Sequence, residues 1–338
     1  MLHYMKLFFT IIACWAFWGN LLSQDSKNSS YYERIDSLWH ITTGFQTNNA
    51  EFLVRYPNRQ KVILTPATAV QQYIKMEYGV LYVKAGYTPG WANPDKSAIT
   101  GQNKRTEIGV GFTLKGLDID LSRQKARGYY IRNTKDYIPS WLPGQPYLQI
   151  PNLNTTLYSF QIGLSTRSTL PVGALYSERT RLLKNTWSFI PSFSFYWIEM
   201  HNDAPMQPGL YNNDRHRDFN LRLPMAFAMT TKSGWYAIVL GGPVVGLSLF
   251  STELYDINLR PSVQRSSHLA LGYTSKIRAG YNGKKWYTGI SAFSEQYFTT
   301  LQDVRTTRNF SGAEIHIGTR IPPFRLLKKT NQLLEKWF

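Results

Sequence analysis

The segment from Asp218 to Thr230, DFNLRLPMAFAMT, alternates large apolar residues with polar or small ones. Every odd position from 219 to 229 is Phe, Leu or Met, whereas the even positions between them are Asn, Arg, Pro or Ala. Because successive side chains of a β-strand point to opposite faces, one face of this strand must meet a continuous apolar medium. The alternation recurs at least five times along the chain, and this repetition predicts an antiparallel β-barrel whose outer surface contacts lipid.

The composition fits such a barrel and argues against a helical bundle in a bilayer. After residue 22, no stretch approaches the roughly 20 consecutive apolar residues of a spanning helix, whereas a strand crosses with about 10 residues, half of them apolar. Aromatic residues make up 15% of the chain, with 22 Tyr and 10 Trp, and these side chains favour membrane interfaces. A mean hydropathy of −0.31 is compatible with strands whose second face is wet.

The charge balance bears on the expected partners. The formal net charge is +17, from 38 Lys and Arg against 21 Asp and Glu. In a cytoplasmic protein this excess would suggest nucleic acid. An exported barrel instead meets the phosphate-rich headgroups of outer-membrane lipids and lipopolysaccharide, so these are the expected partners and nucleic acid is not.

The first 23 residues predict a signal peptide. Lys6 precedes an apolar stretch from Leu7 to about Leu22, and a polar run follows, with cleavage expected near Ser23. The single cysteine, Cys14, weakly resembles a lipoprotein cleavage site, but the apolar run continues eight residues past it. We therefore expect a mature chain without cysteine, with lipidation of Cys14 as the alternative. The expected location is the outer membrane of a Gram-negative bacterium.

The mature chain divides into three parts. Residues 24–50 are predicted to be a periplasmic segment, in which 31–39 could form a helix or a first strand. Residues 51–321 are predicted to form the barrel, with about 12 strands and a range of 10 to 14. Residues 322–338 predict an amphipathic helix at the periplasmic leaflet. The alternative is that terminal Phe338 imitates the aromatic end that the barrel assembly machinery recognises.

Polar residues on the second face of the strands predict a wet lumen. In the hairpin 106–122, Lys115-Gly116 forms the turn, and Asp118 and Asp120 alternate with aliphatic residues, so both carboxylates should face inward. Charges of both signs inside a narrow barrel more often cross-link and plug it than select a solute. The lumen-facing candidates are Glu107, Asp118, Asp120, Arg222, Lys276, Arg278, Glu314 and His316.

Four tryptophans are predicted to lie in the aromatic girdles of the membrane: Trp187, Trp197, Trp235 and Trp286. Trp187 and Trp197 are ten residues apart, which projects to roughly 25 Å for a strand tilted by about 40°. Three regions resist this pattern. Residues 235–250 are apolar on both faces around Gly241-Gly242-Pro243, which leaves two short strands, a bulged strand or a lumenal segment as alternatives.

The other two regions are 51–87 and 166–183, each of which admits more than one alignment of strands and so contributes to the range in strand number. Long connections at 88–105, 125–154 and 201–217 are expected outside the cell, and short turns in the periplasm. If residues 170–177 form a strand, one long connection falls on the wrong side.

Motifs of soluble enzymes are absent from the sequence. It contains no GxxxxGK[ST], HExxH or GxSxG pattern and no Cys-His spacing for a metal, so no cofactor or metal is expected. His216 lies in a charged stretch and is expected to be solvated. His268 and His316 lie at or within strands near serines, so a lipid-cleaving or acyl-transferring barrel is the enzymatic alternative.

Two stretches resemble a known family. The hairpin RTEIGVGFTLKGLDIDLS at 105–122 and the run LYSERTRLLKNTWSFIPSFSFYWIEM at 175–200 are similar to the domain-of-unknown-function family 4421 of Bacteroidota, which comprises predicted outer-membrane proteins. The resemblance extends from about residue 45 to 321, and the basic tail after Pro323 departs from it. It implies a barrel and brings no activity or catalytic residues.

These observations predict a non-enzymatic outer-membrane β-barrel with a structural, pore or surface-interaction role. The solute or surface partner is not identified by the sequence. Besides the phospholipase- or acyltransferase-type barrel, a secreted soluble β-sandwich that binds a ligand is an alternative.

Overall fold

The computed structural model describes residues 30–55, 61–67, 70–92, 97–114, 116–202, 213–255, 260–301 and 304–323. The predicted signal peptide with Cys14 and the predicted tail helix after residue 323 lie outside the described residues.

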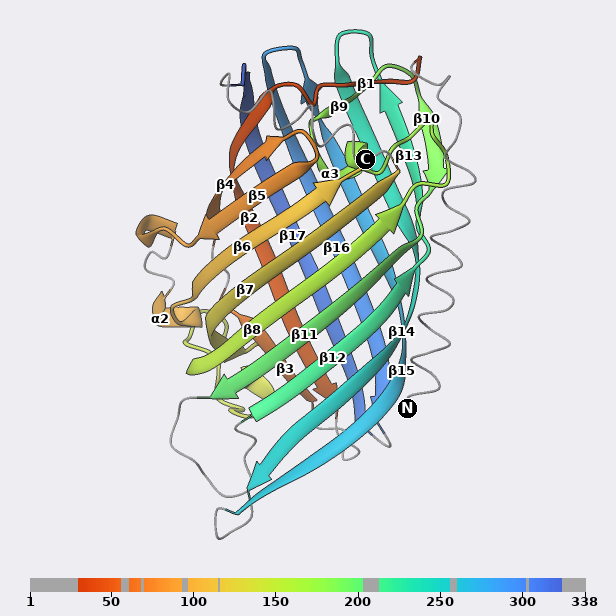
Figure 1. The fold of residues 1–338 in the computed structure, drawn as a ribbon. Helices are drawn as coiled ribbons and strands as arrows, with labels where there is room; N and C mark the ends of the chain where they lie inside the picture. The colour runs from red at the N-terminus through yellow and green to blue at the C-terminus, as the bar shows by residue number, and fades with distance from the viewer. Residues whose placement is uncertain are drawn as a thin grey trace.

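Twelve strands of the described chain form a closed antiparallel ring (Figure 1), which confirms the predicted fold and strand number. Each strand pairs with the next, and the ring closes where the last strand pairs with the first from Arg305↔Arg55 to Ile321↔Trp39. The ring contains β2 (Trp39–Arg55), β4 (Gln71–Tyr78), β5 (Leu81–Tyr87), β6 (Lys104–Thr113), β7 (Leu117–Ile131), β8 (Leu148–Leu164), β11 (Ser192–Asn202), β12 (Asn213–Arg222), β14 (Trp235–Tyr255), β15 (Pro261–Asn282), β16 (Trp286–Leu301) and β17 (Val304–Ile321).

The barrel begins earlier than predicted. Residue 51 was expected to open it, but β2 begins at Trp39 and pairs with β17 along its whole length. In its first half the outward face carries Thr43 and Thr47 between apolar residues, so the apolar alternation that marks the other strands is interrupted here. Residues 39–50 therefore belong to the barrel and not to a separate segment.

The two ends of the barrel differ. At one, here named the turn end, β2 begins, β17 ends and short turns join β4 to β5, β6 to β7 and β15 to β16. The opposite end, the loop end, carries the connections 88–103 and 132–147, and β11 ends and β12 begins there. Two of the three predicted long connections thus lie at one end, whereas residues 203–212 of the third are outside the described residues. Only the connection 165–185 at the turn end is long, and it contains the helix α3 (Gly173–Tyr176) in place of the strand considered for 170–177.

Two ring positions are each occupied by two short strands laid end to end. β12 is followed by β13 (Met225–Thr230), and both pair with β14, which runs unbroken from Trp235 to Tyr255. The break falls at Pro224, whose missing N–H cannot join the ladder. β11 is preceded in the same way by β10 (Thr186–Phe189), with Pro191 at the break. Residues 235–250 are thus one continuous strand.

Side-chain orientation follows the predicted alternation. On β12 and β13 the parity is kept across the break, so that Phe227 and Met229 are exposed on the outside while Ala226 and Ala228 are buried within. Ile108 and Leu269 are each 64% exposed on the outer surface, as are many other large apolar residues around the ring. The outer wall is therefore an apolar band, and the polar parity faces the lumen.

Short elements complete the ends. β3 (Lys61–Pro66) pairs with β2 and β7 at the loop end, where β4 to β6 have already stopped. At the turn end, β1 (Tyr32–Arg34) pairs with β9 (Thr180–Leu182). The remaining helical turns are η1 (Gly90–Ala92), α2 (Ser97–Thr100) and η2 (Thr134–Asp136). No helix within the described ranges is long and apolar enough to cross a membrane.

At the break beside Pro224 the backbone comes close to Gly242 of the adjacent strand β14, and substitution of this glycine tests the packing. A Cβ added to Gly242 would lie 2.5 Å from both the Leu223 carbonyl oxygen and Pro224 Cα, whereas one added to Gly241 would meet only the Thr274 oxygen at 3.8 Å. We predict that Gly242→Ala lowers the free energy of unfolding by roughly 1–3 kcal/mol, as overpacking does. The neighbouring variant Gly241→Ala should match the wild type. Urea midpoints of the detergent-folded barrel measure both, and equal midpoints for the two variants would contradict this reading of the break.

Candidate functional site

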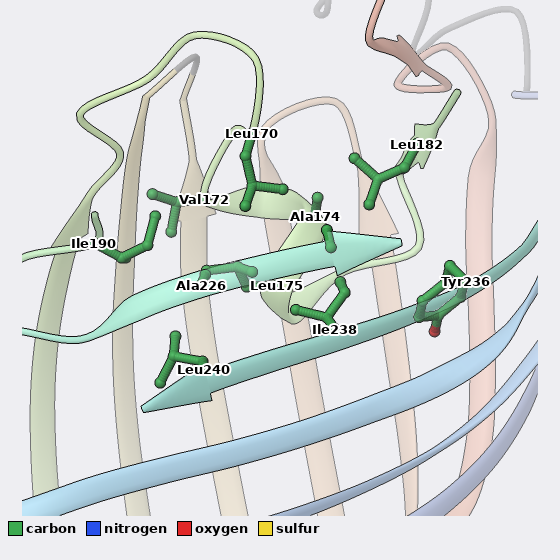
Figure 2. Close-up of a cluster of buried hydrophobic side chains, with 11 residues drawn as sticks. Leu170, Val172, Ala174, Leu175, Leu182, Ile190, Ala226, Tyr236, Ile238 and Leu240 are labelled. Carbon is green, nitrogen blue, oxygen red and sulfur yellow. The ribbon is translucent and has the colours of Figure 1, made fainter. Parts of the chain in front are cut away.

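Residues 165–182, here named the plug, fold inside the turn end of the barrel. Their apolar side chains Leu170, Val172 and Leu175 are fully buried and pack against the inner face of β14 at Ile238 and Leu240 (Figure 2). Burial of these side chains removes apolar surface from water, which stabilises the plug in the lumen.

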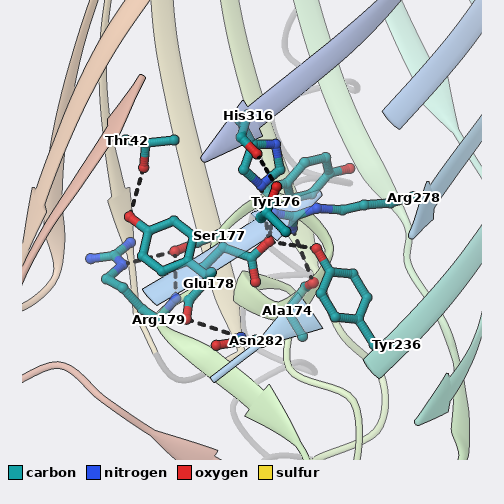
Figure 3. Close-up of polar contacts among 12 residues, drawn as sticks. Thr42, Ala174, Tyr176, Ser177, Glu178, Arg179, Tyr236, Arg278, Asn282 and His316 are labelled. Atoms are coloured by element: carbon teal, nitrogen blue, oxygen red, sulfur yellow. Dashed lines mark hydrogen bonds and ion pairs between the residues drawn. The ribbon is translucent and has the colours of Figure 1, made fainter. Parts of the chain in front are cut away.

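Glu178 is the polar centre of the plug. Its Oε1 lies 2.7 Å from Arg278 Nη2 of β15 and 3.2 Å from His316 Nε2 of β17, and it accepts a hydrogen bond from the Tyr236 hydroxyl of β14 (Figure 3). Arg278 and Glu178 are almost completely buried. A single carboxylate therefore ties the plug to three wall strands.

The residues on either side of Glu178 reach the opposite wall. Ser177 donates a 2.8 Å hydrogen bond to Glu77 Oε1 of β4, and Arg179 Nε lies 3.4 Å from the same oxygen. Arg179 Nη1 also donates to the Gly79 carbonyl at 2.6 Å. Because β4 lies across the lumen from β14 and β15, Ser177, Glu178 and Arg179 span the barrel at its turn end.

Main-chain carbonyls of the plug are also satisfied by the wall. The Glu178 carbonyl accepts hydrogen bonds from Arg320 at 2.7 Å and from Asn282 at 3.1 Å, and Asn282 also donates to the Thr180 carbonyl. Lys75 donates to the Tyr176 carbonyl at 3.2 Å. Buried backbone groups are costly without partners, so these contacts let an irregular segment fill the lumen.

The charge state of Glu178 fits this role. Burial alone would raise its pKa, but the Arg278 guanidinium and the hydrogen bond from His316 outweigh burial and lower it below its ordinary value. Glu178 is therefore held as a carboxylate.

A cavity of about 320 Å³ lies in the lumen next to the plug, with Tyr176 of α3 in its lining. Most of its charged side chains are already paired. Lys84 Nζ lies 3.3 Å from Glu107 Oε1, and the Tyr73 hydroxyl donates to Glu314 at 2.7 Å. Asp118 accepts a 2.6 Å hydrogen bond from Thr113.

The loop-end half of the lumen is lined differently. Buried Phe52, Tyr129, Ile198 and Tyr297 belong to one apolar cluster there. Beside it, Arg308 forms a buried ion pair with Asp218. The polar cavity thus lies between an apolar layer and the plug.

All eight predicted lumenal residues face inward, in three groups. Arg278 and His316 hold the plug, whereas Arg222 pairs with Glu295 at 2.7 Å near Tyr196. The other five line the cavity: Glu107, Asp118, Asp120, Lys276 and Glu314.

The four predicted girdle tryptophans all face outward. Trp187, Trp235 and Trp286 lie at the turn end and are 40%, 57% and 51% exposed. Trp197 lies at the middle of β11, beside Tyr158 with ring centroids 5.7 Å apart.

His316, a candidate base of the enzymatic alternative, has a carboxylate beside each ring nitrogen. Nε2 lies 3.2 Å from Glu178 and Nδ1 lies 3.1 Å from Glu314. His216, expected to be solvated, instead packs between Phe52 and Phe250. No cluster able to hold a metal ion occurs in the part of the chain that the structure describes.

The plug residues Ser177, Glu178 and Arg179 were not predicted as functional. Their signal is the stretch YSERTR, which places three charges between an apolar stretch and a strand without any alternation. Lys75, Glu77 and Lys84 were also missed, because the strands before residue 88 admitted more than one alignment.

The fold and this site define a twelve-stranded β-barrel closed at one end by its own connection. A family model for a domain of unknown function, DUF4421, matches residues 24–320, and the chain belongs to this family. None of the curated proteins compared with it matched.

Solved structures with a similar fold are distant. The Pseudomonas putida toluene transporter TodX is 7% identical with a TM-score of 0.30, covering 85% of this chain and 91% of that one. The β domain of the Bordetella autotransporter BrkA is 12% identical with a TM-score of 0.39, covering 81% and 98%. The Escherichia coli outer membrane protease OmpT is 9% identical with a TM-score of 0.37, covering 86% and 98%.

Removing the charge of Glu178 should loosen the plug. We predict that Glu178→Gln, which leaves Arg278 buried without its counter-ion, destabilises the docked plug by about 3–5 kcal/mol. Hydrogen exchange of the amides of residues 170–182 should be faster in this variant than in the wild type.

The matched control is Glu199→Gln, whose partner Arg215 lies 3.8 Å away on the exposed outer wall. Because the folded pKa of Glu178 is lowered, its contribution is complete above the unfolded value of about 4.3 and is lost as pH falls through the folded pKa. The difference between wild type and Glu178→Gln should shrink on acidification. Equal exchange in the two proteins at neutral pH would show that Glu178 does not hold the plug.

Proposed function

We propose that this protein is an outer-membrane barrel that transports small polar solutes and carries out no chemistry of its own. The observation that carries the proposal is the polar cavity that ends on the plug. Protein interiors are close-packed, so a barrel with a purely structural role would be expected to fill its lumen with side chains. A cavity of about 320 Å³ lined by charged groups suits a hydrated solute.

In this proposal the plug controls the passage of solute through the barrel. It is an internal connection joined to the wall at both ends, and it contacts the wall through side chains and hydrogen bonds that can exchange for water. In this proposal the structure is the closed state, and solute passes when the plug leaves the turn end. The proposed location in the outer membrane rests on the apolar outer band. The turn end carries the short turns, the start of β2 and the end of β17, which favours it as the periplasmic end. Delivery to the membrane by the barrel assembly machinery is part of this proposal.

Conductance tests the transport role. Replacing residues 170–182 with a Gly/Ser segment of equal length removes the plug contacts, and we expect this variant to give single-channel currents in planar bilayers well above those of the wild type. The control replaces residues 138–146 of a loop-end connection in the same way and should conduct like the wild type. Heat-modifiable migration checks that all three barrels are folded. A folded plug variant without current would overturn the proposal.

The loop-end border of the apolar band suggests a lipid partner. Arg123, Tyr158, Trp197 and Arg217 are in register on four adjacent strands, all on the outer face. The guanidinium of Arg123 lies 5.6 Å from the Tyr158 ring centroid, and that of Arg217 lies 5.4 Å from that of Trp197. On β7 and β12 the outward residues are apolar on the turn-end side of this row, and the next outward residue beyond it is basic on both strands, Lys125 and Arg215. We propose that the row contacts the phosphates of lipopolysaccharide in the outer leaflet.

Lipid retention tests this contact. The double variant Arg123→Gln/Arg217→Gln should retain less lipopolysaccharide on purification in mild detergent, by roughly tenfold or more at about 1 kcal/mol per cation. The control is Lys284→Gln/Lys285→Gln, which removes the same charge from a turn-end turn. Lipid A bound per barrel is measured by mass spectrometry. Equal losses in both variants would mean that the row has no special role.

A further inference from the structure

Two charged side chains in the cavity differ from the rest. Asp120 of β7 and Lys276 of β15 both line it, and no other described residue forms a hydrogen bond or an ion pair with either side chain. The one contact recorded for the Lys276 ammonium is the face of the Tyr176 ring, whose centroid lies 4.3 Å away. The neighbouring charges are engaged, since Lys84 pairs with Glu107 and Asp118 with Thr113.

The two side chains lie on facing walls. In one direction round the ring β7 and β15 are separated by β8, β11, β12 and β14, and in the other by β6, β5, β4, β2, β17 and β16. The lumen between them is empty enough to form the cavity. It therefore presents a carboxylate on one side and an ammonium on the other, with no ion pair joining the two.

We propose that the cavity binds a zwitterionic solute, an amino acid or a short peptide, with its ammonium group at Asp120 and its carboxylate at Lys276. Charged groups removed from water are costly unless they are paired, and hydrogen bonds between ionised partners are the strong ones. A solute with one charge would satisfy only one wall. A solute with both charges satisfies both, and the polar groups of Ser122 and Gln161 in the lining can serve its peptide groups. This inference rests on the proposed transport function and names its substrate class.

The binding site also touches the plug. Tyr176, over which Lys276 lies, belongs to α3, and the carbonyl of the same residue accepts the hydrogen bond of Lys75. A solute carboxylate at Lys276 therefore sits against the segment that closes the turn end.

The test uses the full detergent-folded barrel and four probes: alanine, trialanine, N-acetyl-trialanine and trialanine amide. Binding is followed by saturation-transfer NMR titration. Trialanine should bind at least about tenfold more tightly than either blocked peptide, because each blocked form lacks one charge-assisted contact. Alanine separates a free amino acid from a peptide as the solute, and tight binding of either supports the inference.

Variants of Asp120 and Lys276 test which end of the solute each side chain binds. Asp120→Asn should abolish the preference for trialanine over its N-acetyl form, and Lys276→Gln should abolish the preference over its amide. Glu199→Gln and Lys125→Gln remove matched charges from the outer face and should keep both preferences. Heat-modifiable migration confirms that each variant is folded.

The inference is overturned if alanine and trialanine do not bind, or if blocked and free peptides bind equally. It is also overturned if the two lumenal variants keep both preferences. Each of these results leaves the conductance of the plug variant unaffected, so failure of the substrate class is distinguishable from failure of the transport function. Zwitterion binding by a barrel whose plug variant does not conduct would reject transport alone.

Discussion

A strand that crosses a bilayer has lipid on one face and something else on the other, and every part of this barrel follows from that division. The ring of strands satisfies the backbone hydrogen bonds of the wall, which the bilayer could not do. One parity then supplies the apolar outer band, and the other supplies whatever fills the lumen. Because each side chain is committed to one face, the contents of the lumen are decided by every second residue of the strands.

β14 is where the inner parity departs from the rule. Its inward residues Tyr236, Ile238 and Leu240 are apolar or aromatic, which would be unfavourable beside a wet lumen. The plug resolves this, because Leu170, Val172 and Leu175 cover that face. The polar half of the same segment, centred on Glu178, is matched by Arg278 on the adjacent strand β15 and by His316 on β17. An apolar inner face and a buried cation on adjacent strands are thus two halves of one docking surface.

Much of the wall could be predicted from the sequence because strand parity is local. Asp118, Asp120 and Lys276 were assigned to the lumen from their immediate neighbours, and in the structure all three line the cavity. The first half of β2 was missed because Thr43 and Thr47 interrupt the apolar residues of its outward face. The plug could not be predicted, because the wall residues that hold Glu178 are 58 to 142 residues away in the chain and meet it only when the ring closes. Residues 235–250 are apolar on both faces because the inner face packs against the plug. From the sequence alone, that pattern was compatible with several structures.

The most direct test of the account asks whether the plug lies inside the turn end of the folded barrel. A Cβ at Gly173 of α3 would lie 2.8 Å from Thr113 Cγ2 of β6. With Cys14, the one cysteine of the sequence, replaced by serine, Gly173→Cys/Thr113→Cys should form a disulfide under mild oxidation, detected as a shift on non-reducing gels. The pair Gly173→Cys/Gly144→Cys, with its second cysteine in a loop-end connection, should not. A folded barrel in which the first pair fails to cross-link, or in which both pairs cross-link equally, would contradict a plug docked at the turn end.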